Sequence, residues 1–236
     1  MKAVLAIVIP ALNEADALPA LLSDLRALTI ETQVMVVDGG STDGTVAAAR
    51  SAAAEVIVTR AGRGAQLAAG ALATSAPFLC FLHADVRLGA DARRALERLA
   101  ARAEIDGGTA HAFSLAIDAD GWSYRTIERG ANWRSRWMQL PYGDQGLALP
   151  RALYERAGGY ADVPIMEDVA LVRALRRVAR VAILPERVMV SARRWRRHGV
   201  LRRTLLNWLL LIGYAVGTSP RRLARWYRVE RAPTIR

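Results

Sequence analysis

Short apolar runs alternate with longer amphipathic segments over the first 105 residues, and this alternation constrains the fold more than any other feature of the chain. Strands of about five residues that alternate with helices of about 10–15 residues form βαβ units around a parallel sheet. The fold class is therefore predicted to be α/β, with a mostly parallel, Rossmann-like central sheet flanked by helices. Strands are expected at residues 4–9, 33–37, 55–59 and 77–82, and helices at residues 14–28, 41–53, 63–74 and 90–104.

The loops after the four strands form the first candidate site. Ligands of parallel sheets bind at the carboxyl ends of the strands. That rule selects residues 10–14, 38–43, 60–64 and 83–85. All four stretches carry polar or glycine-rich sequence, so the composition agrees with the topology.

The second half of the chain is less regular. Strands are expected at residues 111–118, 146–149 and 181–190, and a helix with two carboxylates in its first turn within residues 164–178. Residues 122–140 are rich in Trp and Arg and are either helical or irregular. An apolar segment at residues 198–216 precedes a basic tail.

Composition limits the cellular context and the partners. The single cysteine, Cys80, rules out a disulfide within the chain and is expected in the core. The first apolar run breaks at Pro10, so a signal peptide is not expected and the protein is placed in the cytoplasm. Residues 1–120 carry 10 Lys and Arg against 14 Asp and Glu, whereas residues 121–236 carry 23 against 8. This basic half lacks a nucleic-acid recognition motif, so no nucleic-acid partner is expected.

Two of the glycine-rich loops have both a chemical and a purely structural interpretation. Asp38 precedes GGSTDGT, where glycines allow close approach of a ligand and Ser41 or Thr42 can cap the next helix. Arg60 and Arg63 flank a helix start in RAGRG, which favours an anion but also fits a solvated turn. Neither loop matches a Walker or a dinucleotide fingerprint.

Two further polar groups can carry chemistry. His83 and Asp85 end the fourth strand as His-Ala-Asp and can ligate Mn²⁺ or Mg²⁺, although a surface turn is the alternative. Glu167 and Asp168 precede an apolar helix, where local pattern favours helix capping over a general base.

Six stretches together resemble the family 2 glycosyltransferases, which have the GT-A fold. The chain looks most like a small bacterial subgroup with a His-Ala-Asp variant of the family's D-x-D element. The stretches occur in the family's order over residues 4 to about 178: VIPALNEADALPALL, VVDGGSTDGT, GRGAQLAAGA, FLHADVRL, GDQGLALPRALYERAGGY and MEDVALVRALRR.

The resemblance implies a division of the chain. A GT-A domain is expected over residues 1–190, with a nucleotide-binding half at 1–105 and an acceptor half at 106–190. A basic amphipathic helical extension is expected over residues 191–236.

The resemblance also implies roles for individual residues. Asp38 matches the carboxylate that contacts the base, and Asp85 matches the metal-contacting Asp of the D-x-D element. His83 stands where an Asp is usual, which leaves its role as a second metal ligand open. The residues that match donor-binding motifs are Pro10, Ala11, Glu14, Asp38, Arg63, Gly64, Ala84 and Asp85.

The implied reaction is an inverting transfer from a nucleotide-diphosphate sugar, with a UDP-sugar favoured, to a hydroxyl or phosphate acceptor. Asp168 matches the family's general base, with Glu167 beside it. A divalent cation is expected to offset the charge on the leaving diphosphate. A nucleotidyltransferase is discounted, because PALNEAD has neither the glycine nor the lysine that such a loop needs. A non-catalytic nucleotide-sugar binding module is a weaker alternative.

The acceptor side is less defined. Asp144 and Gln145 fall in the acceptor region, with a structural role as the alternative. Arg194 and Trp195 lie in SARRW, which resembles the Q-x-x-R-W element without its Gln. This element is interpreted either as a diphosphate contact or as a basic surface.

The apolar run at residues 205–216 is too short to span a bilayer. It fits a core helix or a homodimer helix, and also an interfacial helix at an anionic membrane, for which a lipid or polyprenyl-phosphate acceptor would follow. In that case the protein would be peripheral on the inner face of the cell membrane.

Overall fold

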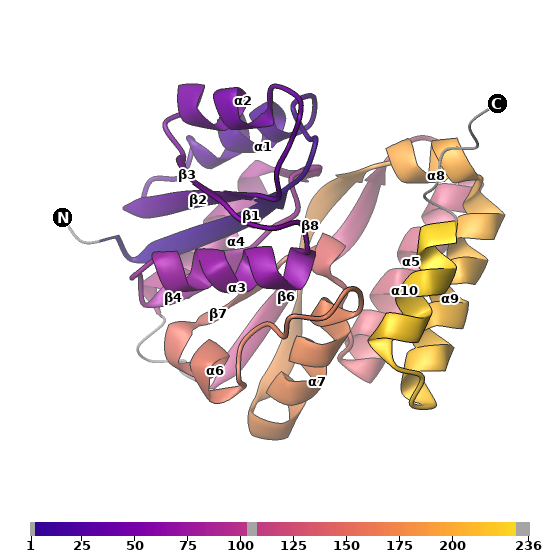
Figure 1. Ribbon diagram of the computed structural model, residues 1–236. Helices are drawn as coiled ribbons and strands as arrows, with labels where there is room; N and C mark the ends of the chain where they lie inside the picture. The colour runs from indigo at the N-terminus through magenta and orange to yellow at the C-terminus, as the bar shows by residue number, and fades with distance from the viewer. Residues whose placement is uncertain (1–2, 103–107, 230–236) are drawn as a thin grey trace.

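The structure, a computed structural model, describes residues 3–102 and 108–229. Eight strands form one mixed sheet in the order β3-β2-β1-β4-β7-β6-β8-β5 (Figure 1). Four of the seven pairings are parallel, so the predicted mostly parallel sheet is confirmed by a small margin. The strands are β1 (Leu5–Ala11), β2 (Thr32–Asp38), β3 (Glu55–Val58), β4 (Phe78–Phe81), β5 (Val86–Leu88), β6 (Thr109–Asp118), β7 (Leu147–Pro150) and β8 (Arg180–Ser191).

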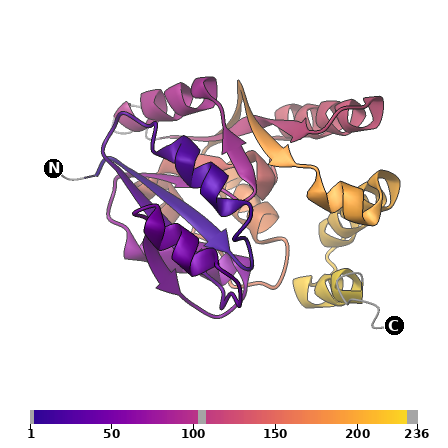
Figure 2. The ribbon, with the colours of Figure 1, turned by 90° about the horizontal axis from the view of Figure 1, so that it is seen from above.

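Helices cover both faces of the sheet, and three more stand to one side of it. The helices are α1 (Leu18–Leu25), α2 (Thr45–Ser51), α3 (Arg63–Ala73), α4 (Ala90–Ala101), α5 (Trp122–Met138), α6 (Arg151–Arg156), α7 (Glu167–Val178), α8 (Arg193–His198), α9 (Val200–Ala215) and α10 (Pro220–Val229). Helices α1, α2 and α4 pack on one face, and α3, α6 and α7 on the other. Helices α5, α9 and α10 stand together beside the sheet, at the right of Figures 1 and 2.

Alternating side chains of β1 explain its continuous apolar sequence. Leu5, Ile7 and Ile9 pack with α1, whereas Ala6 and Val8 pack with α3 on the opposite face. A strand with helices on both faces has no solvent-facing side, so nearly every position is apolar.

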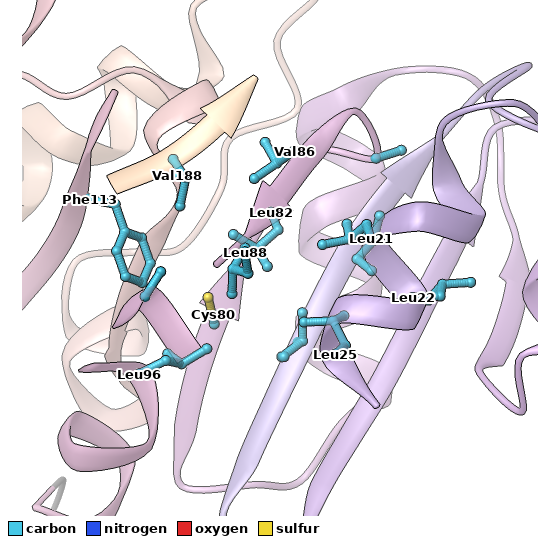
Figure 3. Close-up of a cluster of buried hydrophobic side chains, with 14 of the residues drawn as sticks. Leu21, Leu22, Leu25, Cys80, Leu82, Val86, Leu88, Leu96, Phe113 and Val188 are labelled. Carbon is cyan, nitrogen blue, oxygen red and sulfur yellow. The ribbon is translucent and has the colours of Figure 1, made fainter. Parts of the chain in front are cut away.

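Cys80 lies fully buried in β4, as predicted. It sits among leucines of the core cluster on the face of the sheet that α1, α2 and α4 cover, between α1 and α4 (Figure 3). Burial raises the pKa of its thiol well above the ordinary value, so it remains an uncharged core group at neutral pH.

The predicted caps of the second helix are wrong. Helix α2 begins at Thr45, several residues after Ser41 and Thr42. The Ser41 hydroxyl instead accepts the Asn13 N–H at 2.9 Å, and the Thr42 N–H donates to Asn13 Oδ1 at 2.9 Å. These side chains join the loops after β1 and β2, because the loops lie side by side at the carboxyl ends of paired strands.

Two further differences from the sequence-based expectation concern the second half. Residues Val86–Leu88 form β5, which was not predicted, because three residues are too few to show a pattern and their pairing to β8 is long-range. The segment that was either helical or irregular is the regular helix α5. Among the described residues, no helix has both the length and the apolarity to cross a bilayer.

Candidate active site

A cleft of ≈ 880 Å³ opens at the carboxyl ends of the strands. Its walls come from the loops after β1 and β4, the start of α3, the turn at residues 142–144, the segment before α7, and the helices α9 and α10. The predicted edge of the sheet is therefore where the cleft lies. The predicted site residues that line it are Pro10, Ala11, Glu14, Arg63, His83, Ala84, Asp85, Asp144 and Asp168.

Gln66 holds the floor of the cleft together. Its side-chain amide donates to the Ala11 carbonyl at 2.9 Å and to the Val37 carbonyl at 2.8 Å. Gln66 therefore links α3 to the carboxyl ends of both β1 and β2. Sequence reasoning missed Gln66, and its only signal was a polar residue inside the otherwise apolar face of GRGAQLAAGA.

His83 is 8% exposed and lies against Arg63. The Nη1 of Arg63 is 3.2 Å from Nε2 of His83. A guanidinium has only donors, so this contact requires Nε2 to be the unprotonated ring nitrogen, with the proton on Nδ1. The imidazole lone pair that would bind a cation is thus directed at Arg63.

Glu167 and Arg63 form an ion pair beneath the cleft, with Glu167 1% exposed. Burial raises the pKa of Glu167, and the Arg63 charge opposes that shift. Burial would lower the pKa of Arg63, but Glu167 and Asp168 outweigh it and the pKa rises. Arg63 is therefore a fixed cation at the start of α3.

Asp168 lines the cleft, whereas the side chain of its neighbour Glu167 is buried. Its Oδ2 accepts the Gly143 N–H at 2.8 Å, and its Oδ1 accepts the Val169 N–H at 2.7 Å. The preceding Met166 has φ +66°, a left-handed conformation that starts α7 without a side-chain cap. As consecutive residues of α7, Glu167 is buried and Asp168 lines the cleft, a difference that the capping interpretation did not distinguish.

Gly143 brings the two chemical groups together. A Cβ built on Gly143 would lie 2.7 Å from His83 Nε2 and 3.4 Å from Asp168 Oδ2. His83 of the His-Ala-Asp triplet and Asp168 thus approach each other across a single glycine. A side chain at this position would occupy the space between them.

Besides Glu167, four predicted residues lie beside the cleft instead of lining it. The Asp38 carboxylate is 2% exposed and accepts the N–H groups of Gly40 and Ser41, each at 2.8 Å. The others are Gly64, whose Cα faces the Ala161 carbonyl, Gln145, which is 0% exposed, and Trp195, which packs on the core.

The acceptor-side predictions divide. Asp144 lines the cleft. The Gln145 amide donates to the Phe113 carbonyl at 2.9 Å and accepts from Ser135 Oγ at 2.6 Å, which supports its structural alternative. The side chain of Arg194 lies outside the described part of the structure.

The α9–α10 hairpin forms a wall that sequence reasoning did not anticipate. Asn207 of α9 and Arg221, Arg225 and Tyr227 of α10 line the cleft. The sequence signal was a pair of arginines at i and i+4, which share one helix face. Their position against the cleft depends on tertiary packing and could not be inferred from that spacing.

Comparison with known proteins identifies the family. A model of the glycosyl transferase family 2 matches residues 6–160, about two thirds of the chain. The chain belongs to glycosyl transferase family 2. Uncharacterized glycosyltransferases of Mycobacterium tuberculosis and Mycobacterium bovis are 40% identical over 80 residues. That match spans 34% of this chain and 35% of each relative, so the chain aligns with about a third of their length.

Solved glycosyltransferases share the fold. A structure of S. aureus TarS in complex with UDP-GlcNAc has a TM-score of 0.59 at 17% identity, covering 81% of this chain and 58% of that one. A mannosyltransferase from Pyrobaculum calidifontis, solved with GDP-Man and Mn²⁺, has a TM-score of 0.61 at 18% identity, covering 80% and 57%. Glucosyl-3-phosphoglycerate synthase from M. tuberculosis, solved with Mn²⁺ and UDP, has a TM-score of 0.55 at 19% identity, covering 80% and 70%. The fold is GT-A, as the sequence predicted.

The cleft fits a divalent cation through one carboxylate. No cluster of three or more His, Cys, Asp or Glu side chains suited to a metal occurs within residues 3–102 and 108–229. Asp85 is a hard oxygen donor at the cleft, and the remaining ligands of Mn²⁺ or Mg²⁺ are usually water and substrate phosphate oxygens. His83 fits less well, because its Nε2 faces Arg63.

Proposed function

We propose that this family 2 protein is an inverting glycosyltransferase that moves a sugar from a nucleotide-diphosphate sugar to an acceptor hydroxyl or phosphate. The observation that carries this proposal is that Asp168 and His83, the first residue of the His-Ala-Asp triplet, approach each other across Gly143. A single displacement needs a base and a diphosphate-binding element on opposite sides of the anomeric carbon. The position of Asp168 beside His83, which lies 3.2 Å from Arg63, supports this assignment.

Asp168 is the general base. The Gly143 and Val169 N–H groups hold its two oxygens and so fix the orientation of the carboxylate in the cleft. As the acceptor oxygen bonds to the anomeric carbon, its proton passes to Asp168, and the bond from that carbon to the diphosphate oxygen breaks. Attack from the face opposite the leaving group inverts the anomeric centre.

Arg63 and Asp85 act on the leaving group. Arg63, held as a cation by Glu167, interacts with the negative charge that develops on the diphosphate. When bound at Asp85, a divalent cation supplies further charge compensation. Glu167 is thus a positioning residue, because its carboxylate is buried and reaches Arg63, not substrate.

The donor is proposed to be a UDP-sugar, bound along Pro10, Ala11 and Glu14. Relatives of the same fold have been solved with UDP, UDP-GlcNAc and GDP-Man, so a guanosine donor is the main competitor. A thermal-shift screen of UDP- and GDP-sugars, with and without Mn²⁺, tests this. A ligand at 100 times its dissociation constant stabilises the protein by about 2.7 kcal/mol. No Mn²⁺-dependent stabilisation by any nucleotide sugar would contradict the proposal.

A measurement of turnover distinguishes the enzyme from the alternative, a non-catalytic nucleotide-sugar binding module. A binding module would show the same thermal shift but would not release UDP from the bound donor. The intact Asp85 and Asp168 in the cleft favour the enzyme.

A second candidate property is contact with an anionic membrane at the inner face of the cell membrane. Helix α5 exposes Trp122 (81%), Trp133 (59%) and Trp137 (78%) at helical spacing. Helix α9 exposes an apolar face that consists of Leu205, Trp208, Leu209, Ile212 and Val216. No Asp or Glu occurs between Arg187 and Val229, so the charge of this region complements anionic lipid.

Flotation with phosphatidylglycerol vesicles at low salt tests the membrane proposal. We expect the protein to float with these vesicles, to remain unbound with phosphatidylcholine, and to lose binding in the double variant Trp133→Ser/Trp137→Ser. Sedimentation of the wild type as a stable dimer that these substitutions dissociate would instead assign the face to a second copy.

A further inference from the structure

Four arginines line the cleft, and they fall into two classes. Arg60 pairs with Asp162, and Arg63 pairs with Glu167. Arg221 and Arg225 have no ion-pair partner among the described residues. The uncompensated positive charge of the cleft therefore lies on α10.

The hairpin of α9 and α10 is docked against the segment that leads to Asp168. Leu210, Leu223 and Ala224 are buried against Ile165, which lies three residues before Asp168. The Arg173 guanidinium of α7 also lies 5.2 Å from the ring centroid of Tyr214 of α9. Because these contacts fix α10 to the loop that carries the base, the two free guanidinium groups belong to the Asp168 side of the cleft.

We infer that Arg221 and Arg225 bind a phosphate group of the acceptor and so place its reacting oxygen at Asp168. This inference rests on the proposed function, in which Asp168 activates the acceptor. Arginines at i and i+4 present two guanidinium forks on one helix face, and paired forks suit a phosphate's several oxygens. The phosphate can belong to a lipid or to a soluble phosphomonoester.

The neighbouring Arg222 provides a matched control. It is exposed on the same helix turn but does not line the cleft. The variant Arg222→Gln removes one positive charge from the same helix, whereas the paired variant Arg221→Gln/Arg225→Gln removes two. Long-range charge alone would therefore weaken phosphate binding in both variants, in proportion to the number of charges that each removes.

The test uses calorimetric titration of the full chain with three probes. Glycerol 3-phosphate and dioctanoyl phosphatidic acid, each added to protein saturated with UDP and Mn²⁺, represent the soluble and lipid sources. UDP with Mn²⁺ represents the donor diphosphate. We expect Arg221→Gln/Arg225→Gln to weaken at least one phosphate probe tenfold or more, with UDP affinity and melting temperature unchanged and with Arg222→Gln unaffected. The tighter of the two probes identifies the source.

Three outcomes would overturn the inference. UDP affinity that falls tenfold in the paired variant but not in Arg222→Gln assigns the arginines to the donor. Losses of phosphate affinity in both variants, in proportion to the charge removed, indicate non-specific charge. Absence of phosphate binding to the UDP-saturated wild type removes the acceptor site. Failure of the wild type to bind UDP or any other nucleotide contradicts the proposed function itself, which is a separate result.

Discussion

The two sides of the cleft treat their charged side chains differently. On the sheet side, Glu14, Asp38 and Arg63 all have protein partners that fix their positions. On the hairpin side, Arg221 and Arg225 have none among the described residues. On the sheet side, contacts within the protein hold the charged side chains in place without a ligand. On the hairpin side, the two guanidinium groups remain available to an anionic ligand.

The largest expected effect is a loss of activity when Asp168, the proposed base between the two sides of the cleft, is replaced. Asp168→Asn should lower the rate of donor turnover by about 10²–10⁴-fold, because an amide cannot accept the acceptor's proton. UDP binding should be unchanged. The control is Asp162→Asn, another carboxylate at the cleft, which contacts Arg60 instead of Gly143. Normal turnover by Asp168→Asn would exclude its role as the base.

The rigidity of the sheet side can be tested by crowding it. A Cβ on Gly64 would lie 2.3 Å from the Ala161 carbonyl oxygen, so Gly64→Ala must separate α3 from the loop before α7. We expect the free energy of unfolding to fall by about 1–3 kcal/mol, measured by urea denaturation.

Gly130 of α5 is the control for Gly64. A Cβ there meets nothing within 4 Å, so Gly130→Ala should instead stabilise the helix by up to about 1 kcal/mol. Equal effects of the two substitutions would mean that the close packing of α3 is not rigid.

The smallest expected effect concerns the ion pair between Arg193 and Glu14. The Arg193 Nη2 lies 2.6 Å from Glu14 Oε2, but its side chain is 47% exposed. Arg193→Gln should therefore lower the free energy of unfolding by at most about 1 kcal/mol. Arg196→Gln, an exposed neighbour on α8, serves as the control. A melting-temperature loss beyond that of a surface pair would show that α8 holds the loop after β1 more firmly than the geometry indicates.

The sequence predicted the sheet side well and the hairpin side poorly. Strands β1 to β4 and their helices follow from local periodicity, because each βαβ unit is formed by residues close in sequence. The same locality placed Asp85 at a strand end and Asp168 at a helix start. The contribution of Arg221 and Gln66 arises from contacts between distant segments, which periodicity does not encode.

The acidic pair illustrates the same limit within two residues. Glu167 and Asp168 share composition and position, yet one is buried against Arg63 and the other lines the cleft. Consecutive residues of a helix project about 100° apart, and the packing of α7 in the fold determines which of the two faces the cleft. The sequence alone therefore could not distinguish the surroundings of these two carboxylates.

The two hydrogen bonds of Gln66 limit how far the floor of the cleft can move. They tie the ends of β1 and β2 to α3, so the floor of the cleft cannot widen without breaking buried hydrogen bonds. The α9–α10 hairpin is held in a different way, by side-chain packing of Leu210, Leu223 and Ala224 on Ile165. A ligand bound against the ends of β1 and β2 would therefore meet a surface that is already ordered, and its binding would carry no entropic cost of ordering that surface.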